Sequence, residues 1–192
     1  SVSAFLLNRS SDLSLKNSNN QPKYAFPTGL SARTLVRGGD INNVYGGNDS
    51  TGHVVGGNAV GIYTSIRGNV YGGGNGAYPY TDNPALKNDP TYGDLYYNPT
   101  TVLTEAGISA PSGQESVTAL NRIRPDAEQV SIRLVGKYER DENGEVIESS
   151  IVPTIIHGSV YIGGNCATIK NTNPEIEDPM AQLKIGSYVI AE

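Results

Sequence analysis

The sequence predicts an all-β protein, a right-handed parallel β-helix with an inserted loop and β-hairpin. A motif of the form Val-Tyr-Gly-Gly-Asn recurs along the chain, and such self-similarity is typical of solenoids and repeat arrays. The copies lie at residues 35–40, 44–49, 54–59, 70–77 and 160–167. Their apolar residues are mostly β-branched or aromatic and occur in short runs closed by Gly-Gly, which favours strands. No stretch has a sustained helical period of apolar residues.

The spacing of the copies predicts the length of one coil. The intervals from Val44 to Val70 and from Val160 to Ile185 are nearly equal. Each fits one coil of a β-helix, which takes on the order of 20 to 30 residues. Val54 falls between two copies and is expected on a second face of the same coil. The alternative is a set of independent hairpin turns in an ordinary β-sandwich.

Each position of the motif has a structural role. Valine and tyrosine alternate along a strand, so one side chain points inward and the other outward. The glycine pair allows a sharp corner with positive φ, and the asparagine after it tolerates left-handed backbone and bonds to its own turn. In stacked coils these amides would form ladders. The expected ladder residues are Asn48, Asn58, Asn75 and Asn165.

The repeats divide the single domain, 1–192, into four parts. Residues 1–30 are expected to form an N-terminal cap or irregular segment, 31–77 the repeat coils, 78–154 an inserted loop and hairpin, and 155–192 the final coils. Within the insertion, 115–122 is expected to form a short helical turn. Residues 129–135 alternate apolar and polar, and Asn143-Gly144 is a strong turn signal. We therefore expect 129–135 and 145–151 to form the hairpin.

Composition excludes several classes of function. The net charge of −5 and a pI near 5.0 argue against a general nucleic-acid binder, which needs clustered Lys and Arg. No stretch reaches the roughly 20 apolar residues of a membrane-spanning helix. The only cysteine, Cys166, excludes an intrachain disulfide and is expected to be a small buried filler. The chain begins at Ser1 without Met, so we expect a processed chain or a fragment.

The strings 66–77 and 156–165 resemble a repeat of large secreted surface proteins of Bacteroidetes. In that group the repeats are thought to form a parallel β-helix, and the proteins are described as adhesins. The resemblance covers less than half of the chain, in two blocks, and leaves out 1–29 and the Tyr-rich segment. It implies a fold and an extracellular or cell-surface location, and it carries over no catalytic residues.

Several further motifs have simpler explanations. Residues 72–77 fit a dinucleotide fingerprint, but Tyr78-Pro79-Tyr80 follows instead of a helix N-terminus. A calcium β-roll needs an Asp in successive coils, which leaves at most one calcium near Asp40 and Asp49. His53 and His157 alone do not make a zinc site, although stacking would place them on similar faces. We therefore predict no cofactor, no metal and no catalytic residue.

An enzyme is the main alternative in function. Acidic residues cluster at 89–94, 126–128 and 175–178, and two carboxylates across a cleft can hydrolyse glycosides. Some parallel β-helices degrade polysaccharides, so a polysaccharide lyase or glycoside hydrolase stays open. These acids lie in Pro-rich loops, where a solvated charge is the usual explanation.

The segment after the first repeats is the expected ligand-binding region. A tyrosine on a loop offers a flat apolar face and a hydroxyl, which suits sugar rings and protein partners. The candidate residues are Tyr78, Tyr80, Tyr92, Tyr96 and Tyr97; the alternative is that they pack the loop against the solenoid. The sequence thus predicts a non-enzymatic structural or adhesive module that binds a glycan or a host or bacterial surface protein. Self-assembly into a shaft through open solenoid ends is a further alternative.

Overall fold

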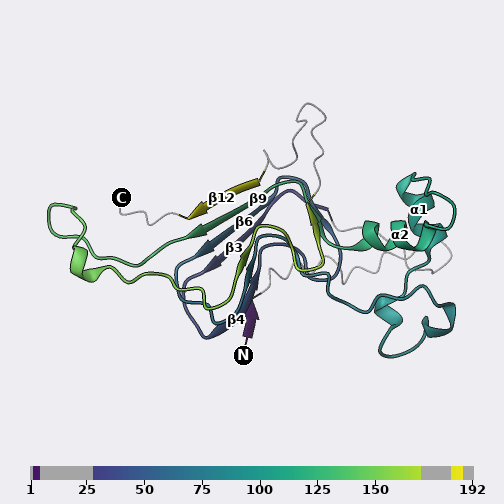
Figure 1. Cartoon of the computed structure of the whole chain (residues 1–192), viewed down its shortest axis with the longest axis horizontal. Coiled ribbons are helices and arrows are strands. Elements are labelled where there is room, and N and C mark those ends of the chain that lie inside the picture. Colours follow the sequence, from purple (N-terminus) through teal and green to yellow (C-terminus); the bar gives the residue numbers. More distant parts are fainter. Residues whose placement is uncertain (1, 5–27, 170–182, 188–192) are drawn as a thin grey trace.

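The computed structural model describes residues 2–4, 28–169 and 183–187, and these form three parallel sheets arranged like the rungs of a small β-solenoid (Figure 1). The first sheet has the order β1 (Val2–Ala4), β4 (Ile41–Tyr45), β7 (Val70–Tyr71), β10 (Val160–Tyr161). The second has β2 (Thr28–Gly29), β5 (His53–Val54), β8 (Asp126–Ala127), β11 (Thr168–Ile169). The third has β3 (Ala32–Val36), β6 (Asn58–Ile62), β9 (Val130–Leu134), β12 (Leu183–Ser187). The chain visits the three sheets in turn, so the predicted solenoid arrangement is confirmed.

The register confirms most of the predicted spacing. Val44 pairs with Val70, as the first interval predicts, and Val70 pairs with Val160. Val54 lies in β5 of the second sheet, on another face of the coil, as expected. The interval from Val160 to Ile185 is not a coil, because Ile185 lies in the third sheet, opposite Ile132. The near-equality of the two intervals is a coincidence, because the second interval runs from the first sheet to the third and is therefore only part of a coil.

Alternation along the strands builds the core. Val44 and Val70 are fully buried inside the coil, so valine is the inward residue of the predicted alternating pair. The tyrosines next to them, Tyr45 and Tyr71, stack on the other side of their strands, and Tyr161 stacks on Tyr71. Ile62 and Ile66 complete the same apolar cluster, each fully buried. Burial of such branched side chains between three sheets is the main stabilising contribution in the described region.

A ladder of side-chain amides forms, but only two of the four predicted asparagines take part in it through their side chains. Asn165 Nδ2 donates to Asn75 Oδ1 at 3.0 Å, and Asn75 Nδ2 donates to Asp49 Oδ1 at 3.0 Å. Asn48 takes part only through its backbone carbonyl, which accepts from the backbone N–H of Asn75. Asn58 lies in the third sheet and donates to the carbonyl of Gly72 at 3.2 Å. The prediction is wrong for Asn58 because its copy of the motif lies on a different face of the coil.

The predicted hairpin strand 129–135 is wrong. Val130–Leu134 is β9, which pairs in parallel with β6 on one side and β12 on the other. A smaller antiparallel hairpin follows it, with bridges Lys137–Val152 and Arg140–Val146 around the Asn143-Gly144 turn. The alternation of β9 marks any half-buried strand and carries no information about its partner. β8 and β9 thus lie within residues 78–154, which the sequence predicts to be an insertion.

Two helices correct the all-β prediction. α2 (Glu115–Ile123) confirms and extends the short helical turn expected at 115–122. α1 (Pro99–Ala106) was not expected, although its local signals are clear. The Asn98 side chain accepts from the N–H of Thr101, and Gly107 ends the helix with φ 63°. Both are standard helix-terminating features.

The two insertions leave the solenoid in different directions. Figure 1 shows the helices on one side and the hairpin at the other end of the molecule, with the sheets between them. No helix within the described ranges has the length and apolar character to cross a membrane. The predicted N-terminal cap, 1–30, lies mostly outside the described residues, of which only 2–4 and 28–30 belong to it.

Candidate functional site

The five predicted tyrosines all belong to the helical insertion, and two of them tie it to the solenoid. The hydroxyl of Tyr78 donates to Asp49 Oδ2, and that of Tyr80 donates to the carbonyl of Ser50. The two rings meet edge to face with centroids 6.1 Å apart. Burial, followed by the hydrogen bond to Asp49, raises the pKa of Tyr78 to about 12. Burial also raises the pKa of Tyr80, so both phenols stay neutral donors at physiological pH.

The other three tyrosines lie deeper in the insertion. Tyr97 is 5% exposed and packs with Val102, Leu103, Ala119 and Ile123 in a second apolar cluster. Its hydroxyl donates to the carbonyl of Ser116 at 3.2 Å. Tyr92 and Tyr96 are half-buried, on either side of the 3-10 turn Gly93–Leu95. The ring of Tyr97 thus packs against both helices, and ligand binding by the five tyrosines stays a prediction.

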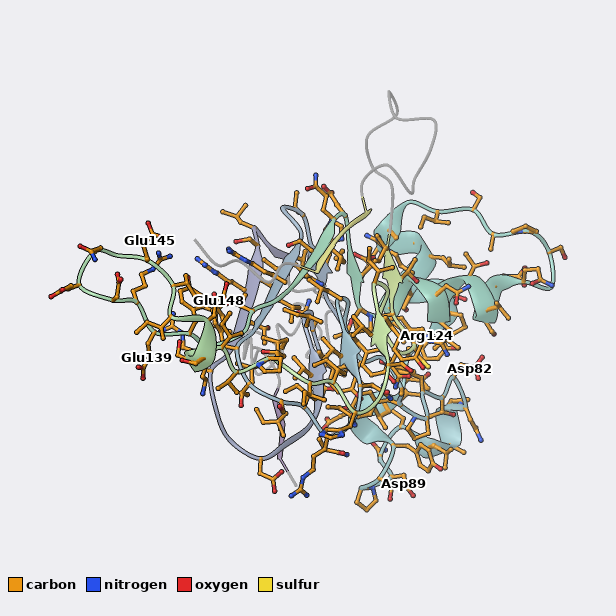
Figure 2. All side chains as sticks on the ribbon, turned by 60° about the vertical axis from the view of Figure 1, so that its left-hand side comes forward. Asp82, Asp89, Arg124, Glu139, Glu145 and Glu148 are labelled. Carbon is orange, nitrogen blue, oxygen red and sulfur yellow. The ribbon has the colours of Figure 1, made fainter. Side chains whose placement is uncertain are left out.

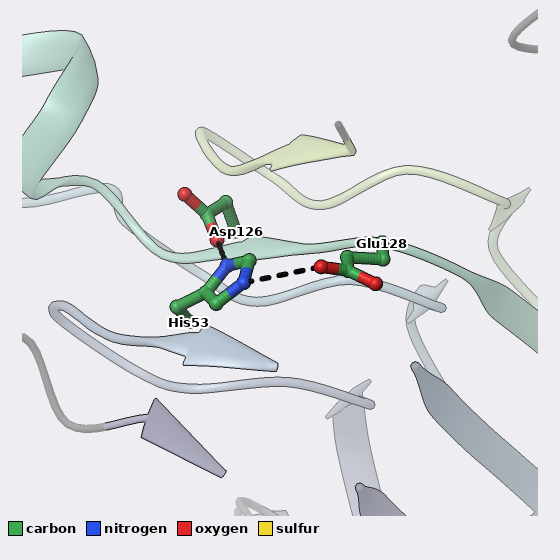
Figure 3. A network of polar contacts seen from close by, with 3 residues as sticks. All are labelled: His53, Asp126 and Glu128. Atoms are coloured by element: carbon green, nitrogen blue, oxygen red, sulfur yellow. Dashed lines mark hydrogen bonds and ion pairs between the residues drawn. The ribbon is translucent and has the colours of Figure 1, made fainter. Parts of the chain in front are cut away.

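A polar network that the sequence did not predict joins the second and third coils (Figure 3). His53 Nδ1 donates to Asp126 Oδ1, and His53 Nε2 lies 3.5 Å from Glu128 Oε1. His53 and Asp126 are register partners on β5 and β8, although 73 residues separate them. The Asp126 side chain is 3% exposed, against 21% for His53 and 19% for Glu128. No sequence signal marks this contact, because the insertion hides the alignment of the two strands.

The chemistry open to this network is limited. A His–Asp pair activates a nucleophile in acyl transfer, but the imidazole here has a carboxylate on each nitrogen. Glycoside hydrolysis needs two carboxylates facing each other across a cleft, whereas Asp126 and Glu128 lie two residues apart on one face and meet the same histidine. Among the described residues, no group of three or more His, Cys, Asp or Glu is placed to hold a metal ion. The network is best suited to locking adjacent coils together.

Three further predictions concern isolated residues. Cys166, expected to be buried, is exposed, because its coil is the outermost of the first sheet as described. His157 does not share a face with His53, since it precedes β10 of the first sheet. The two aspartates of the possible calcium site have separate partners. Asp40 pairs with Arg67 at 2.7 Å, and Asp49 accepts from Asn75 and Tyr78.

No protein family matches the chain, and no curated protein or solved structure shows significant similarity to it. The resemblance to Bacteroidetes surface proteins therefore stays a prediction, while the solenoid-like arrangement of sheets that it implies is observed.

Proposed function

We propose that the chain is a non-enzymatic structural and adhesive module of the cell exterior, a right-handed parallel β-helix that presents a binding surface to a glycan or a surface protein. The observation that carries this proposal is the stacking of equivalent residues through successive coils. Val44, Val70 and Val160 are in register, and the rings of Tyr45, Tyr71 and Tyr161 stack on one another. Stacked residues of this kind make the surface of the solenoid rigid, which suits a structural or binding module. The right hand follows the usual handedness of parallel strand connections.

The contacts of three acidic residues support a non-enzymatic role, whereas the predicted cluster 175–178 lies outside the described residues. Asp126 is buried against His53, Glu128 meets the same ring, and Asp49 holds Asn75 and Tyr78. These carboxylates serve contacts between neighbouring segments rather than facing an open cleft. The carbohydrate-active alternative would need a pair of free acids on opposite walls.

The test is a panel of glycans and purified surface proteins probed with the whole chain, with the heat-denatured chain as control. Specific retention of the folded chain on at least one ligand, with no new reducing ends and no unsaturated products from any polysaccharide, is the expected result. Retention on none would remove the adhesive role. Release of cleaved sugars would replace this proposal with the enzymatic one.

A second candidate function, self-assembly, is favoured by the outermost described strand of the first sheet. Val160 and Tyr161 in β10 repeat the sequence of β7, yet they are 39% and 45% exposed. A further strand stacked on β10 would bury them as Val70 is buried, and an unpaired strand edge favours such pairing. Sedimentation of wild type and Tyr161→Lys over a range of concentrations tests this. A concentration-dependent larger species that the variant lacks is the expected outcome, and a monomer throughout would exclude it.

A further inference from the structure

The outward face of the third sheet carries two arginines, Arg33 and Arg133, in neighbouring outward rows of the register. Arg33 on β3 pairs with Ala59 on β6, which pairs with Ser131 on β9. Two residues further along, Leu35, Gly61 and Arg133 form the next outward row. Alternation places all of these on the side of the sheet opposite the buried Val60 and Ile132.

A groove of about 320 Å³ runs across the N-terminal ends of β3, β6 and β9. Its lining residues come from three neighbouring coils. The residues that shape it are Ser31, Arg33, Gly57, Ala59, Gln129 and Ser131. Gly57 has φ 89°, and a Cβ there would come within 2.7 Å of Gln129 Cβ. The hollow therefore depends on small residues between the arginine and the amide.

This face is positively charged, whereas the protein as a whole has a negative net charge. Arg33, Arg37 and Arg133 are all exposed, and none forms an ion pair with a carboxylate in the described part of the chain. Arg37 lies over the ring of Tyr63, 5.7 Å from its centroid. No Asp or Glu occupies an outward position of β3, β6 or β9.

The acidic groups that give the chain its net charge of −5 include many on the two insertions. Figure 2 shows Glu139, Glu145 and Glu148 on the hairpin and Asp82 and Asp89 on the helical insertion. The solenoid face is thereby left positive between two acidic projections. A ligand for this face must carry negative charge.

We propose that this groove binds an acidic polysaccharide chain, an inference that rests on the adhesive function proposed above and names its ligand class. The guanidinium of Arg33 is a planar fork that matches carboxylate and sulfate oxygens. Gln129, Ser31 and Ser131 provide the amide and hydroxyl groups that bind sugar hydroxyls. Arg33 lines the groove, and Arg133 lies just beyond it, two coils away, about 10 Å along the axis, and two residues further along the strand direction. A polysaccharide with a charge on each disaccharide has a comparable repeat. A nucleic acid fits less well, because it needs a denser row of cations.

The test measures binding of a chondroitin sulfate oligosaccharide to the whole chain by calorimetry at low salt. The variant R33Q/R133Q removes two charges from the face, and K137Q/R140Q removes two from the hairpin as a matched control. We expect the first variant to bind about tenfold more weakly and the control to bind like wild type. Added salt should weaken binding by the wild type. Ala59→Leu fills the groove and keeps every charge, and it should also bind the oligosaccharide about tenfold more weakly.

Three results would overturn the inference: no binding of the acidic oligosaccharide, equal affinity of wild type and R33Q/R133Q, or tighter binding of single-stranded DNA. Chemically desulfated and carboxyl-reduced oligosaccharide is the neutral control, and its binding with undiminished affinity would also count against the arginines. If the chain is retained on neutral glycans or surface proteins, only this inference fails and the adhesive function stands. If nothing is retained, both fail.

Discussion

The rings of Tyr45 and Tyr71 lie face to face, with centroids 4.9 Å apart and planes 2° from parallel. That separation equals the spacing of neighbouring strands, about 4.8 Å, so the strand ladder itself sets the stack. Tyr161 extends it with the same 4.9 Å separation. Tyr71 is the central ring of these three and contacts another ring on each of its faces.

Replacing Tyr71 tests the contribution of the stack. Tyr71→Ala removes two ring contacts and should lower the free energy of unfolding by about 3 kcal/mol. Tyr161→Ala removes one of these contacts and should cost about half as much. Tyr71→Phe keeps the rings and loses only the hydrogen bond from Asn69 Nδ2 at 3.2 Å, so it should cost less than about 1 kcal/mol. Urea unfolding of the three variants gives the order; equal losses for Tyr71→Ala and Tyr71→Phe would show that the rings contribute little.

Two glycines of the repeats should respond in opposite ways to alanine. A Cβ at Gly72 would overlap Val130 Cγ1 and come within 2.6 Å of the carbonyl oxygen of Ile162. Gly72→Ala should therefore destabilise by about 3 kcal/mol. Gly163 has no heavy atom within 4 Å of such a Cβ, so Gly163→Ala should be neutral or stabilise by up to about 1 kcal/mol. Thermal unfolding of the pair checks the packing of the corner, and a tolerated Gly72→Ala would contradict it.

The buried hydroxyl of Thr34 is a weak point of the core. Thr34 is 7% exposed, lies in register with Val60, and its Oγ1 has no hydrogen-bond partner in the part of the chain that the structure describes. Thr34→Val removes the unpaired hydroxyl at nearly constant volume and should stabilise by about 1 kcal/mol. Thr154→Val is the matched control, because Thr154 Oγ1 donates to the carbonyl of Val135 at 2.6 Å. It should destabilise by a similar amount, and a change of the same sign in both variants would refute the argument.

The burial of Tyr78, together with its hydrogen bond to Asp49, predicts an alkaline transition. The ordinary pKa of 10.0 is raised to about 12 in the folded chain, so folding favours the neutral phenol. The stabilising contribution is complete below pH 10 and is lost as the pH rises through 12. Subtracting the tyrosinate absorbance titration of Tyr78→Phe from that of wild type should leave a component with its midpoint near 12. A midpoint near 10 would mean that Tyr78 is solvated.

Tyr97 separates packing from binding within the predicted tyrosine site. Tyr97→Ala opens a cavity among Val102, Leu103 and Ala119 and should reduce the local stability of the helical insertion by about 3 kcal/mol. Hydrogen exchange should accelerate in α1 and α2 and stay unchanged in β4 and β7. Tyr97→Phe, which loses only the bond to Ser116, should cost about 1 kcal/mol. Lost protection throughout the solenoid would show that the insertion is not an independent unit.

The repeat made the parallel architecture predictable, because one interval between valines already equals a coil. Val44 and Val70 are that interval, and their pairing follows directly from it. The cap residues Asn98 and Gly107 were also present in the sequence, but α1 has too few apolar positions to show a helical period. The capping residues Asn98 and Gly107 predict this helix, whereas the apolar periodicity does not.

The candidate sites were less predictable, because they depend on which strands become neighbours. The contact of His53 with Asp126 requires the chain to leave the solenoid after β7 and return in register. The motif does not show how many residues are inserted between β7 and β8. The sequence predicts a hairpin around Arg133, whereas the parallel pairing of β9 with β6 places Arg133 on one face of the sheet with Arg33.

The unequal lengths of the coils have a kinetic consequence. Asp49 reaches its partner Asn75 across 26 residues, whereas His53 reaches Asp126 across 73. Closing the longer loop costs about 1 kcal/mol more in chain entropy. This cost is paid before β8 and β9 make their contacts. Folding should begin with residues 28–71, where two coils close over short loops. The third coil then docks on this template, and the hairpin and final coil follow it.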